Sequence, residues 1–254
     1  MEQSIKTVII SQARIGSTRL PGKVMMKIEG QELLKIHIDR LKKSRLKDEI
    51  IVATTNNEAD KIIETLCNQW GVKSSRGSED DVLDRFYQTV KDLQPEWVVR
   101  VTSDCPLIDP MLIDGVIAYA QINDKDYCSN ILIESYPDGQ DVEVFKFSAL
   151  KNAWENAKLK SEREHVTPFI RSNCDVNSGS LFKALNFPCM ADYSKIRMTV
   201  DEQKDFDLIE KVIHDLGFND TWLNYTNHII SKGLNKTNED IIRNEGYLKS
   251  IKND

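Results

Sequence analysis

The feature that most constrains the fold is a short apolar run, residues 7–10, followed by a loop rich in glycine and cations, residues 13–23. The run Thr-Val-Ile-Ile is typical of a strand buried on both faces of a parallel sheet. The loop contains no acidic residue and three cations, Arg14, Arg19 and Lys23. Open α/β sheets bind ligands at the carboxyl ends of their strands. Gly16 and Gly22 allow positive φ and close backbone approach, so the loop predicts a phosphate site; a solvated basic turn is the alternative.

The loop matches neither the Gly-x4-Gly-Lys-Ser/Thr motif nor the Gly-x-Gly-x-x-Gly motif. Its string Ala-Arg-x-x-Ser-Thr-Arg-Leu-Pro-Gly-Lys, residues 13–23, resembles the opening of the KDO and acylneuraminate cytidylyltransferases. The resemblance is strongest to the branch of the spore coat polysaccharide biosynthesis protein F. In that superfamily this loop wraps the phosphates of CTP. The resemblance therefore implies nucleotide contacts from Ala13, Arg14, Gly16, Ser17, Thr18, Arg19 and Lys23.

Bulk composition excludes several kinds of protein. The 254 residues are 40% hydrophobic and 29% charged, as in an ordinary globular chain. The net charge of −6 argues against a nucleic-acid surface, which needs a basic stripe. No run approaches about 20 apolar residues, so we expect no membrane insertion. Residues 1–4 carry no cation and the apolar run after them is too short, so we expect no signal peptide. Five scattered cysteines without a Cys-x-x-Cys pair favour reduced thiols in a cytoplasmic protein.

Apolar runs and amphipathic segments alternate along the chain, which predicts a mostly parallel sheet flanked by helices. Expected strands span 7–10, 49–55, 72–76, 97–101, 127–133, 142–145, 181–187 and 195–200. Expected helices span 32–43, 57–70, about 82–90, a segment from Pro110, 150–158, 162–172 and 205–216. The resemblance implies a Rossmann-like, GT-A-like α/β domain over 1–220, with an acceptor and dimerisation region inserted at about 126–175. Residues 221–254 are expected to form a helical extension packed on the outside. By analogy with the family we expect a homodimer, with 127–147 as its interface.

Two aspartates follow expected strands at separate places in the sequence. Asp104 lies in Thr-Ser-Asp-Cys-Pro-Leu, and Asp201 closes Ile-Arg-Met-Thr-Val-Asp. A carboxylate at such a position faces the ligand crevice and suits Mg²⁺, although each could equally be a helix or turn cap. Both segments are similar to the family segments whose aspartates bind magnesium. The resemblance therefore implies a Mg²⁺ site at Asp104 and Asp201, and catalytic roles for these two residues, Arg14 and Lys23.

The segment Arg-Gly-Ser-Glu-Asp-Asp-Val-Leu-Asp-Arg, residues 76–85, resembles a block of the spore coat branch. The same region lies against the nucleotide base in cytidylyltransferases. The resemblance implies nucleotide contacts from Arg76, Ser78 and Arg85, together with Thr54 and Ser103 at the ends of strands. A surface ion pair between Arg85 and Asp81, four residues apart on a helix, is the alternative.

Two further polar segments, residues 136–144 and 163–168, resemble the spore coat branch but not the KDO enzymes closely. We expect their polar side chains to line the acceptor side of the site: Asp138, Gln140, Asp141, Glu143, Arg163, Glu164 and His165. A satisfied structural histidine is the alternative for His165.

The resemblance implies a CTP-dependent nucleotidyltransferase. It would make a CMP-activated sugar, with a sialic-acid-like or KDO-like sugar acid as acceptor, and release pyrophosphate for polysaccharide biosynthesis. A glycosyltransferase is one rival, against which stands the lack of an Asp-x-Asp motif at residues 103–106. A nucleotidyltransferase acting on a phosphorylated acceptor is a second. A binding protein that has lost the chemistry is the third.

Overall fold

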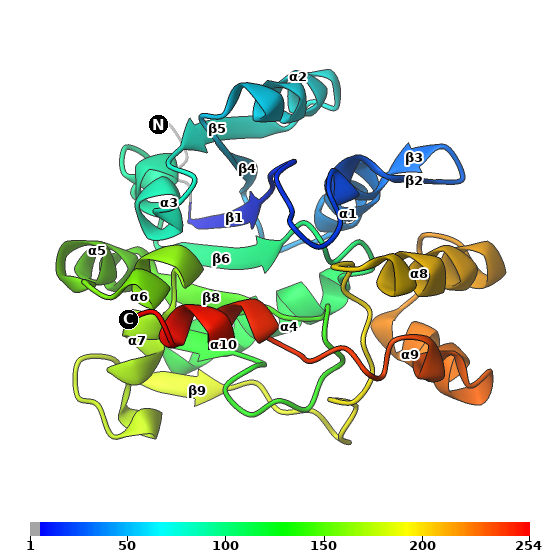
Figure 1. The fold of residues 1–254 in the computed structure, drawn as a ribbon. Coiled ribbons are helices and arrows are strands. Elements are labelled where there is room, and N and C mark those ends of the chain that lie inside the picture. Colours follow the sequence, from blue (N-terminus) through cyan, green and yellow to red (C-terminus); the bar gives the residue numbers. More distant parts are fainter. Residues whose placement is uncertain (1–5) are drawn as a thin grey trace.

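The computed structural model describes residues 6–254 and is built on one seven-stranded sheet (Figure 1). The strand order is β5-β4-β1-β6-β8-β7-β9. The strands are β1 (Thr7–Gln12), β4 (Glu49–Thr55), β5 (Lys73–Gly77), β6 (Trp97–Thr102), β7 (Tyr127–Ser129), β8 (Glu143–Lys146) and β9 (Ala184–Asn186). Strand β8 runs antiparallel to both of its neighbours, β6 and β7, and the other pairings in this sheet are parallel. The expected mostly parallel α/β sheet is therefore confirmed.

Helices cover both faces of the sheet, because successive side chains of a strand point to opposite sides. Ile9 of β1 packs in one apolar cluster with α1 (Leu33–Leu41), α2 (Lys61–Gln69) and α4 (Pro110–Asn123). Val8 and Ile10 pack in a second cluster with α3 (Val82–Val90), α5 (Phe147–Asn156) and α7 (Pro168–Ser172). These two clusters fix the sheet rigidly beneath the loops that follow its strands.

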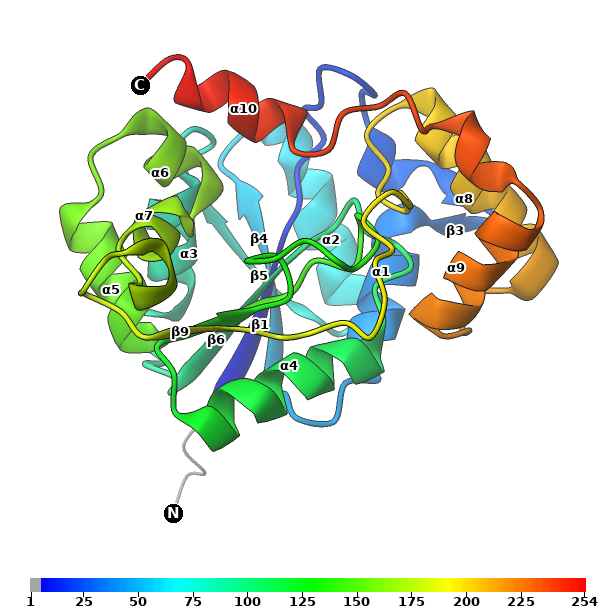
Figure 2. The same cartoon turned by 90° about the horizontal axis from the view of Figure 1, so that it is seen from below.

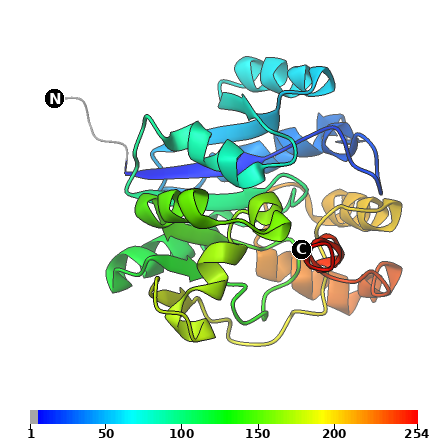
Figure 3. The same ribbon diagram turned by 60° about the vertical axis from the view of Figure 1, so that its left-hand side comes forward.

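A third apolar cluster lies beside the sheet. Helices α8 (Gln203–Leu216) and α9 (Trp222–Ser231) pack there against α1 and the short hairpin of β2 (Lys27–Ile28) and β3 (Gln31–Glu32). Figure 3 shows α8 and α9 in yellow and orange, side by side. The remaining elements are α6 (Lys160–His165), α10 (Glu245–Ile251) and the 3₁₀ turns Lys23–Met25, Glu58–Asp60, Asp175–Asn177 and Leu234–Thr237.

The extension 221–254 is helical in part, but it does more than pack on the outside. Helix α10 contacts α6 and lies at the edge of the sheet toward which β1 runs (Figure 2). Asn244, Glu245 and Tyr247 line the main cavity of the molecule. None of the helices among residues 6–254 is both long and apolar enough to cross a bilayer.

Several expected boundaries are wrong. Residues 195–200 form no strand but a single bridge, Asp138 to Arg197, because their neighbour is a turn. The helix expected over 162–172 is two helices, separated at Val166, which has a φ of 72°. The strands expected over 127–133 and 181–187 shorten to β7 and β9.

Residues 127–147, where the dimer interface is expected, contribute two strands to the central sheet. Strands β7 and β8 lie inside the sheet, and most of residues 127–147 are buried. The exposed or half-exposed positions in it are 131–135, 141 and 146–147. An interface within this segment would have to use these positions, and the homodimer stays a prediction.

Candidate active site

The cationic loop leaves β1 and turns back on itself before the first 3₁₀ turn. Its ends are joined by the backbone hydrogen bond from Gly22 to the carbonyl of Ile15, at 3.1 Å. Gly22 has a φ of 70°, the conformation that glycine adopts without strain. Gly16 does not have a positive φ, so that part of the expectation is wrong. The closed loop aims Lys23 inward, with its side chain 11% exposed.

Lys23 bridges the two aspartates expected to bind metal. Its Nζ lies 2.8 Å from Oδ2 of Asp104 and 2.7 Å from Oδ1 of Asp201. Burial alone would lower the pKa of Lys23, but the two carboxylates override it and raise the pKa. Burial would raise the pKa of Asp104, yet Lys23 holds it well below its usual range. The structure therefore brings together three of the four residues expected to be catalytic.

This carboxylate pair fits a hard divalent cation. One oxygen of Asp104 and one of Asp201 already converge on a single cation, the Lys23 ammonium. Among residues 6–254 no group of three or more acidic, histidine or cysteine side chains could hold a metal. Mg²⁺ in phosphate-transfer sites often uses one or two carboxylates and completes its shell with substrate phosphates and water. Two aspartates are sufficient for such a site.

Arg197 holds the side chain of Asp201 in place. Its guanidinium donates to Asp138, to Asp201 at 2.8 Å and to Asp205 at 2.9 Å. Asp205 is fully buried and also accepts the backbone N–H groups of residues 201 and 202, so its role is structural. The second oxygen of Asp201 is thereby held, while its first oxygen faces Lys23.

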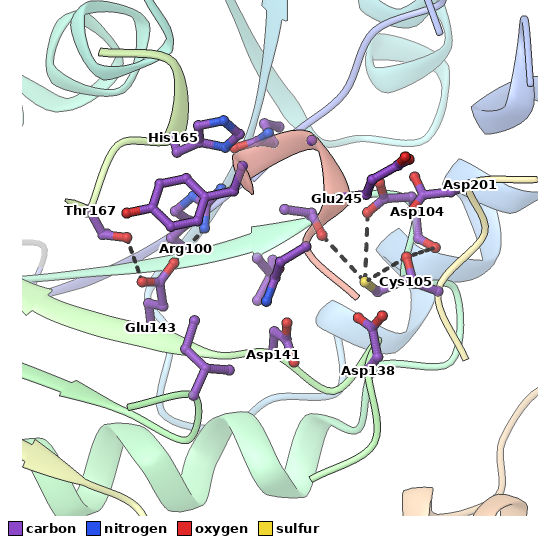
Figure 4. Close-up of a pocket in the computed structure, with 18 of the residues that line it drawn as sticks. Arg100, Asp104, Cys105, Asp138, Asp141, Glu143, His165, Thr167, Asp201 and Glu245 are labelled. Carbon is purple, nitrogen blue, oxygen red and sulfur yellow. Dashed lines mark hydrogen bonds and ion pairs between the residues drawn. The ribbon is translucent and has the colours of Figure 1, made fainter. Parts of the chain in front are cut away.

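A cavity of about 230 Å³ extends away from the carboxylate pair (Figure 4). In Figure 4, Asp104, Asp201 and Glu245 lie at one end, and Arg100, Glu143, His165 and Thr167 lie at the other. Of the residues expected to bind nucleotide or acceptor, the cavity is lined by Arg19, Asp138, Asp141, Glu143 and His165. Arg19 also contacts Asp201, at 3.0 Å. The cavity therefore joins the cationic loop to the region expected for the acceptor.

Acidic groups in this cavity differ sharply in their environments. Burial raises the pKa of Asp141 to about 7 against the opposing charge of Arg243, whose guanidinium lies 2.7 Å away. Burial would also raise the pKa of Glu143, but Arg100 lowers it. Glu143 accepts hydrogen bonds from Arg100 and from Thr167, so it stays ionised and immobile.

The remaining residues expected to bind nucleotide lie at or just after the ends of β1, β4, β5 and β6, apart from Arg85 in α3. Arg14 is exposed and pairs with Glu79 at 3.1 Å. Arg76 donates to the carbonyls of residues 55 and 57, and Arg85 donates to those of residues 78 and 79, so both arginines brace the loops. The surface pair of Arg85 with Asp81 does not form, because Asp81 pairs with Arg163. Of the other expected positions, Gly16 and Thr18 are exposed, Ser17 and Ser78 are half-buried, and Ala13, Thr54 and Ser103 are buried.

Three residues expected on the acceptor side do not line the cavity. Gln140 is fully buried, and its amide bonds the backbone of residues 107 and 109. Arg163 is held by Asp81 and by the carbonyl of Trp154. Glu164 is half-buried and also lies outside the lining. Sequence resemblance selects the segment but cannot tell which way each side chain turns.

The cavity also contains residues that the sequence analysis missed, among them Gln12, Arg100, Arg171, Arg197 and Tyr247. A signal was present for two of them. Arg100 interrupts the apolar run 97–101, and Arg197 interrupts the run 196–200. A charge within a buried apolar segment is costly unless it is paired, and therefore marks a site.

A mostly parallel sheet with a cationic glycine loop and a carboxylate pair at its carboxyl edge defines a nucleotide-binding α/β protein. The chain belongs to the cytidylyltransferase family, whose model matches residues 8–241. It is 46% identical over 208 residues to the uncharacterized protein MJ1063 of Methanocaldococcus jannaschii, covering 80% of this chain and 82% of the relative. It is 33% identical over 219 residues to the spore coat polysaccharide biosynthesis protein SpsF of Bacillus subtilis, covering 83% and 87%. A cytidylyltransferase structure from Leptospira borgpetersenii superposes with a TM-score of 0.86 at 29% identity, covering 94% of this chain and all of that one.

Proposed function

We propose that this protein transfers the cytidylyl group of CTP to a hydroxyl of a sugar acid and releases pyrophosphate, in the cytoplasm, for the synthesis of a surface polysaccharide. The observation that carries the proposal is the convergence of Lys23, Asp104 and Asp201 at the mouth of a polar cavity. Membership of the cytidylyltransferase family and the likeness to SpsF support the choice of base and of pathway. Its five free cysteines fit a reducing compartment.

Nucleotidyl transfer needs positioning and charge stabilisation more than covalent chemistry from the protein. The acceptor oxygen bonds to the α-phosphorus as the bond to the bridging oxygen breaks, and pyrophosphate leaves with that electron pair. Arg14, Arg19 and Lys23 would hold phosphate oxygens, the arginines by a planar fork and the lysine as a point charge. Mg²⁺ held by Asp104 and Asp201 would supply charge that offsets the developing negative charge on the phosphate.

The acceptor would occupy the cavity beyond the carboxylate pair, between β6 and α10. Arg197 prevents Asp201 from turning away, and the Glu143 network keeps the far wall rigid. The hydroxyl on the anomeric carbon of a 2-keto sugar acid is comparatively acidic. A strong protein base is therefore unnecessary for its deprotonation.

Pyrophosphate release tests this proposal. The protein is assayed with Mg²⁺ and each of the four nucleoside triphosphates against a panel of 2-keto sugar acids and sugar 1-phosphates. We expect release with CTP and a sugar acid, reduced about 10²-fold or more by Asp104→Asn. Asp207→Asn, on an exposed face of α8, is the matched control and should keep full activity. Tight binding of a nucleoside diphosphate sugar without any binding of triphosphates would refute the proposal in favour of a glycosyltransferase.

A further inference from the structure

A buried histidine that takes no part in the chemistry described above contacts the loop that carries Asp104. His37 belongs to α1 and is fully buried. Its Nε2 lies 2.9 Å from the hydroxyl of Ser11 in β1, and its Nδ1 lies 2.8 Å from the carbonyl oxygen of Cys105, the residue that follows Asp104. The imidazole therefore joins the first strand to one half of the carboxylate pair.

The two partners of His37 determine which ring nitrogen carries the proton. Burial lowers the pKa of His37 to about 4, so the imidazole is neutral at pH 7 and has a single N–H group. A backbone carbonyl can only accept a hydrogen bond. The proton is therefore on Nδ1, which donates to Cys105, and the bare Nε2 accepts the hydroxyl proton of Ser11.

The peptide between Asp104 and Cys105 is held at both of its ends. The carbonyl of Asp104 accepts the N–H of Val200 at 2.8 Å, one residue before the second aspartate of the pair. The carbonyl of Cys105 accepts the N–H of Ile108 at 3.2 Å and the shorter bond from the imidazole. Because a peptide unit is planar, bonds to two successive carbonyls fix its orientation, and with it the direction of the preceding side chain.

The two aspartates differ in what holds their carboxylates. Asp201 has the guanidinium of Arg197 beside it, at 2.8 Å. Among residues 6–254 no arginine forms an ion pair with Asp104, whose second oxygen accepts a weak bond from the thiol of Cys105 at 3.6 Å (Figure 4). The direction of the Asp104 carboxylate therefore depends more on its backbone than that of Asp201 does.

We propose that His37 is a positioning residue for nucleotidyl transfer: its bond to the carbonyl of Cys105 directs the Asp104 carboxylate to the point where it converges with that of Asp201. The proposal rests on the function proposed above. His37 lies outside the lining of the cavity, so it acts through the backbone and not by contact with substrate. Mg²⁺ demands nearly ideal octahedral geometry, so a tilted carboxylate would weaken its binding.

Two amide variants separate the two hydrogen bonds of the imidazole. His37→Asn places an amide N–H near the position of Nδ1 and can keep the bond to Cys105. His37→Gln places its amide near the position of Nε2 and loses that bond. The control is Ser44→Ala, which removes a buried hydroxyl that donates to Asp114 at 2.6 Å, away from the cavity. Urea unfolding verifies that each variant is folded.

Outer partners of metal ligands typically change metal affinity or activity by about 10–100-fold when they are replaced. We therefore expect kcat for pyrophosphate release to fall about 10–100-fold in His37→Gln, to recover largely in His37→Asn, and to stay at the wild-type value in Ser44→Ala. A merely structural role predicts equal losses in the two amide variants, and that result would overturn the proposal.

Two measurements test His37 without turnover. In the full chain labelled with ¹⁵N-histidine, the His37 signals, assigned among the four histidines by their absence in His37→Asn, should show a protonated Nδ1 and a bare Nε2. Mn²⁺ affinity is measured by electron paramagnetic resonance without CTP, in chains that also carry Lys23→Met, so that no ammonium competes for the carboxylates. His37→Gln should lower this affinity about tenfold or more, and His37→Asn should restore most of it.

A proton on Nε2, or the same Mn²⁺ affinity with and without His37→Gln, would overturn the proposal and leave the proposed function standing. Absence of pyrophosphate release by the wild-type protein with every acceptor would refute the proposed function, and the Mn²⁺ affinities would then decide the role of His37. If Lys23→Met alone binds no Mn²⁺, the carboxylate pair is not a metal site, and the proposal fails with it.

Discussion

Arg197 offers the sharpest test of how the site is held together. Its side chain is 7% exposed and bonds three carboxylates, one of them the fully buried Asp205. Arg197→Met keeps much of the side-chain volume but removes every one of these bonds. Asp205 and Asp138 would then be buried as charges without their principal partner.

Breaking a buried ion pair by removing one partner costs about 3–5 kcal/mol, since the remaining charge has lost its solvation and its counter-ion. For a chain of this size each kcal/mol lowers the melting temperature by about 2–4 °C. We therefore expect Arg197→Met to lower the melting temperature by about 6–20 °C, measured by circular dichroism and by urea unfolding at pH 7.

Two further variants make the measurement specific. Lys204→Met breaks a solvent-exposed pair with Asp240, and it should leave the melting temperature nearly unchanged, because water and salt screen such a pair. In the double variant Arg197→Met with Asp205→Asn, no charge is left at position 205, so part of the lost stability should return. A loss below about 1 kcal/mol for Arg197→Met alone, or a double variant as unstable as the sum of both changes, would refute the reasoning.

Three other predictions follow from the same structure. Lys23→Met should tighten Mn²⁺ binding in the absence of CTP about tenfold or more, because the Lys23 ammonium occupies the point where the two carboxylates converge. Electron paramagnetic resonance measures the free Mn²⁺. An unchanged affinity for Mn²⁺ would contradict the prediction. The pKa of Asp141 is raised to about 7, so the folded state keeps a proton that the unfolded state releases, and stability should fall as the pH rises from about 4 to 7. Asp141→Asn should remove that fall from urea unfolding measured between about pH 4 and 8, and a persisting fall would assign it to other groups. Gly139→Ala should lower the free energy of unfolding in urea by about 1–3 kcal/mol or more, because φ of Gly139 is 102° and a Cβ would lie 2.7 Å from the backbone of Met198. The control Gly246→Ala places its Cβ in open space and should cause no comparable loss.

Much of the fold could be predicted because local patterns decide it. The β-branched runs at 7–10, 49–55 and 97–101 are buried on both faces and became β1, β4 and β6. Residues 195–200 show the limit of such patterns. An apolar run becomes a strand only if another strand lies beside it, and here the neighbour is a turn. Pairing partners are set by the tertiary fold.

The candidate site, like the fold, could be predicted from the sequence only in part. Residue type and spacing indicated the loop 13–23 and the two aspartates after strands. The family resemblance indicated the polar segments 136–144 and 163–168. The tertiary structure decided which of these side chains meet. It joined Lys23 to Asp104 and Asp201, turned Gln140 and Arg163 away from the cavity, and brought α10 over it. Such contacts join residues up to 178 positions apart in the sequence, and only the packing of the whole chain fixes their geometry.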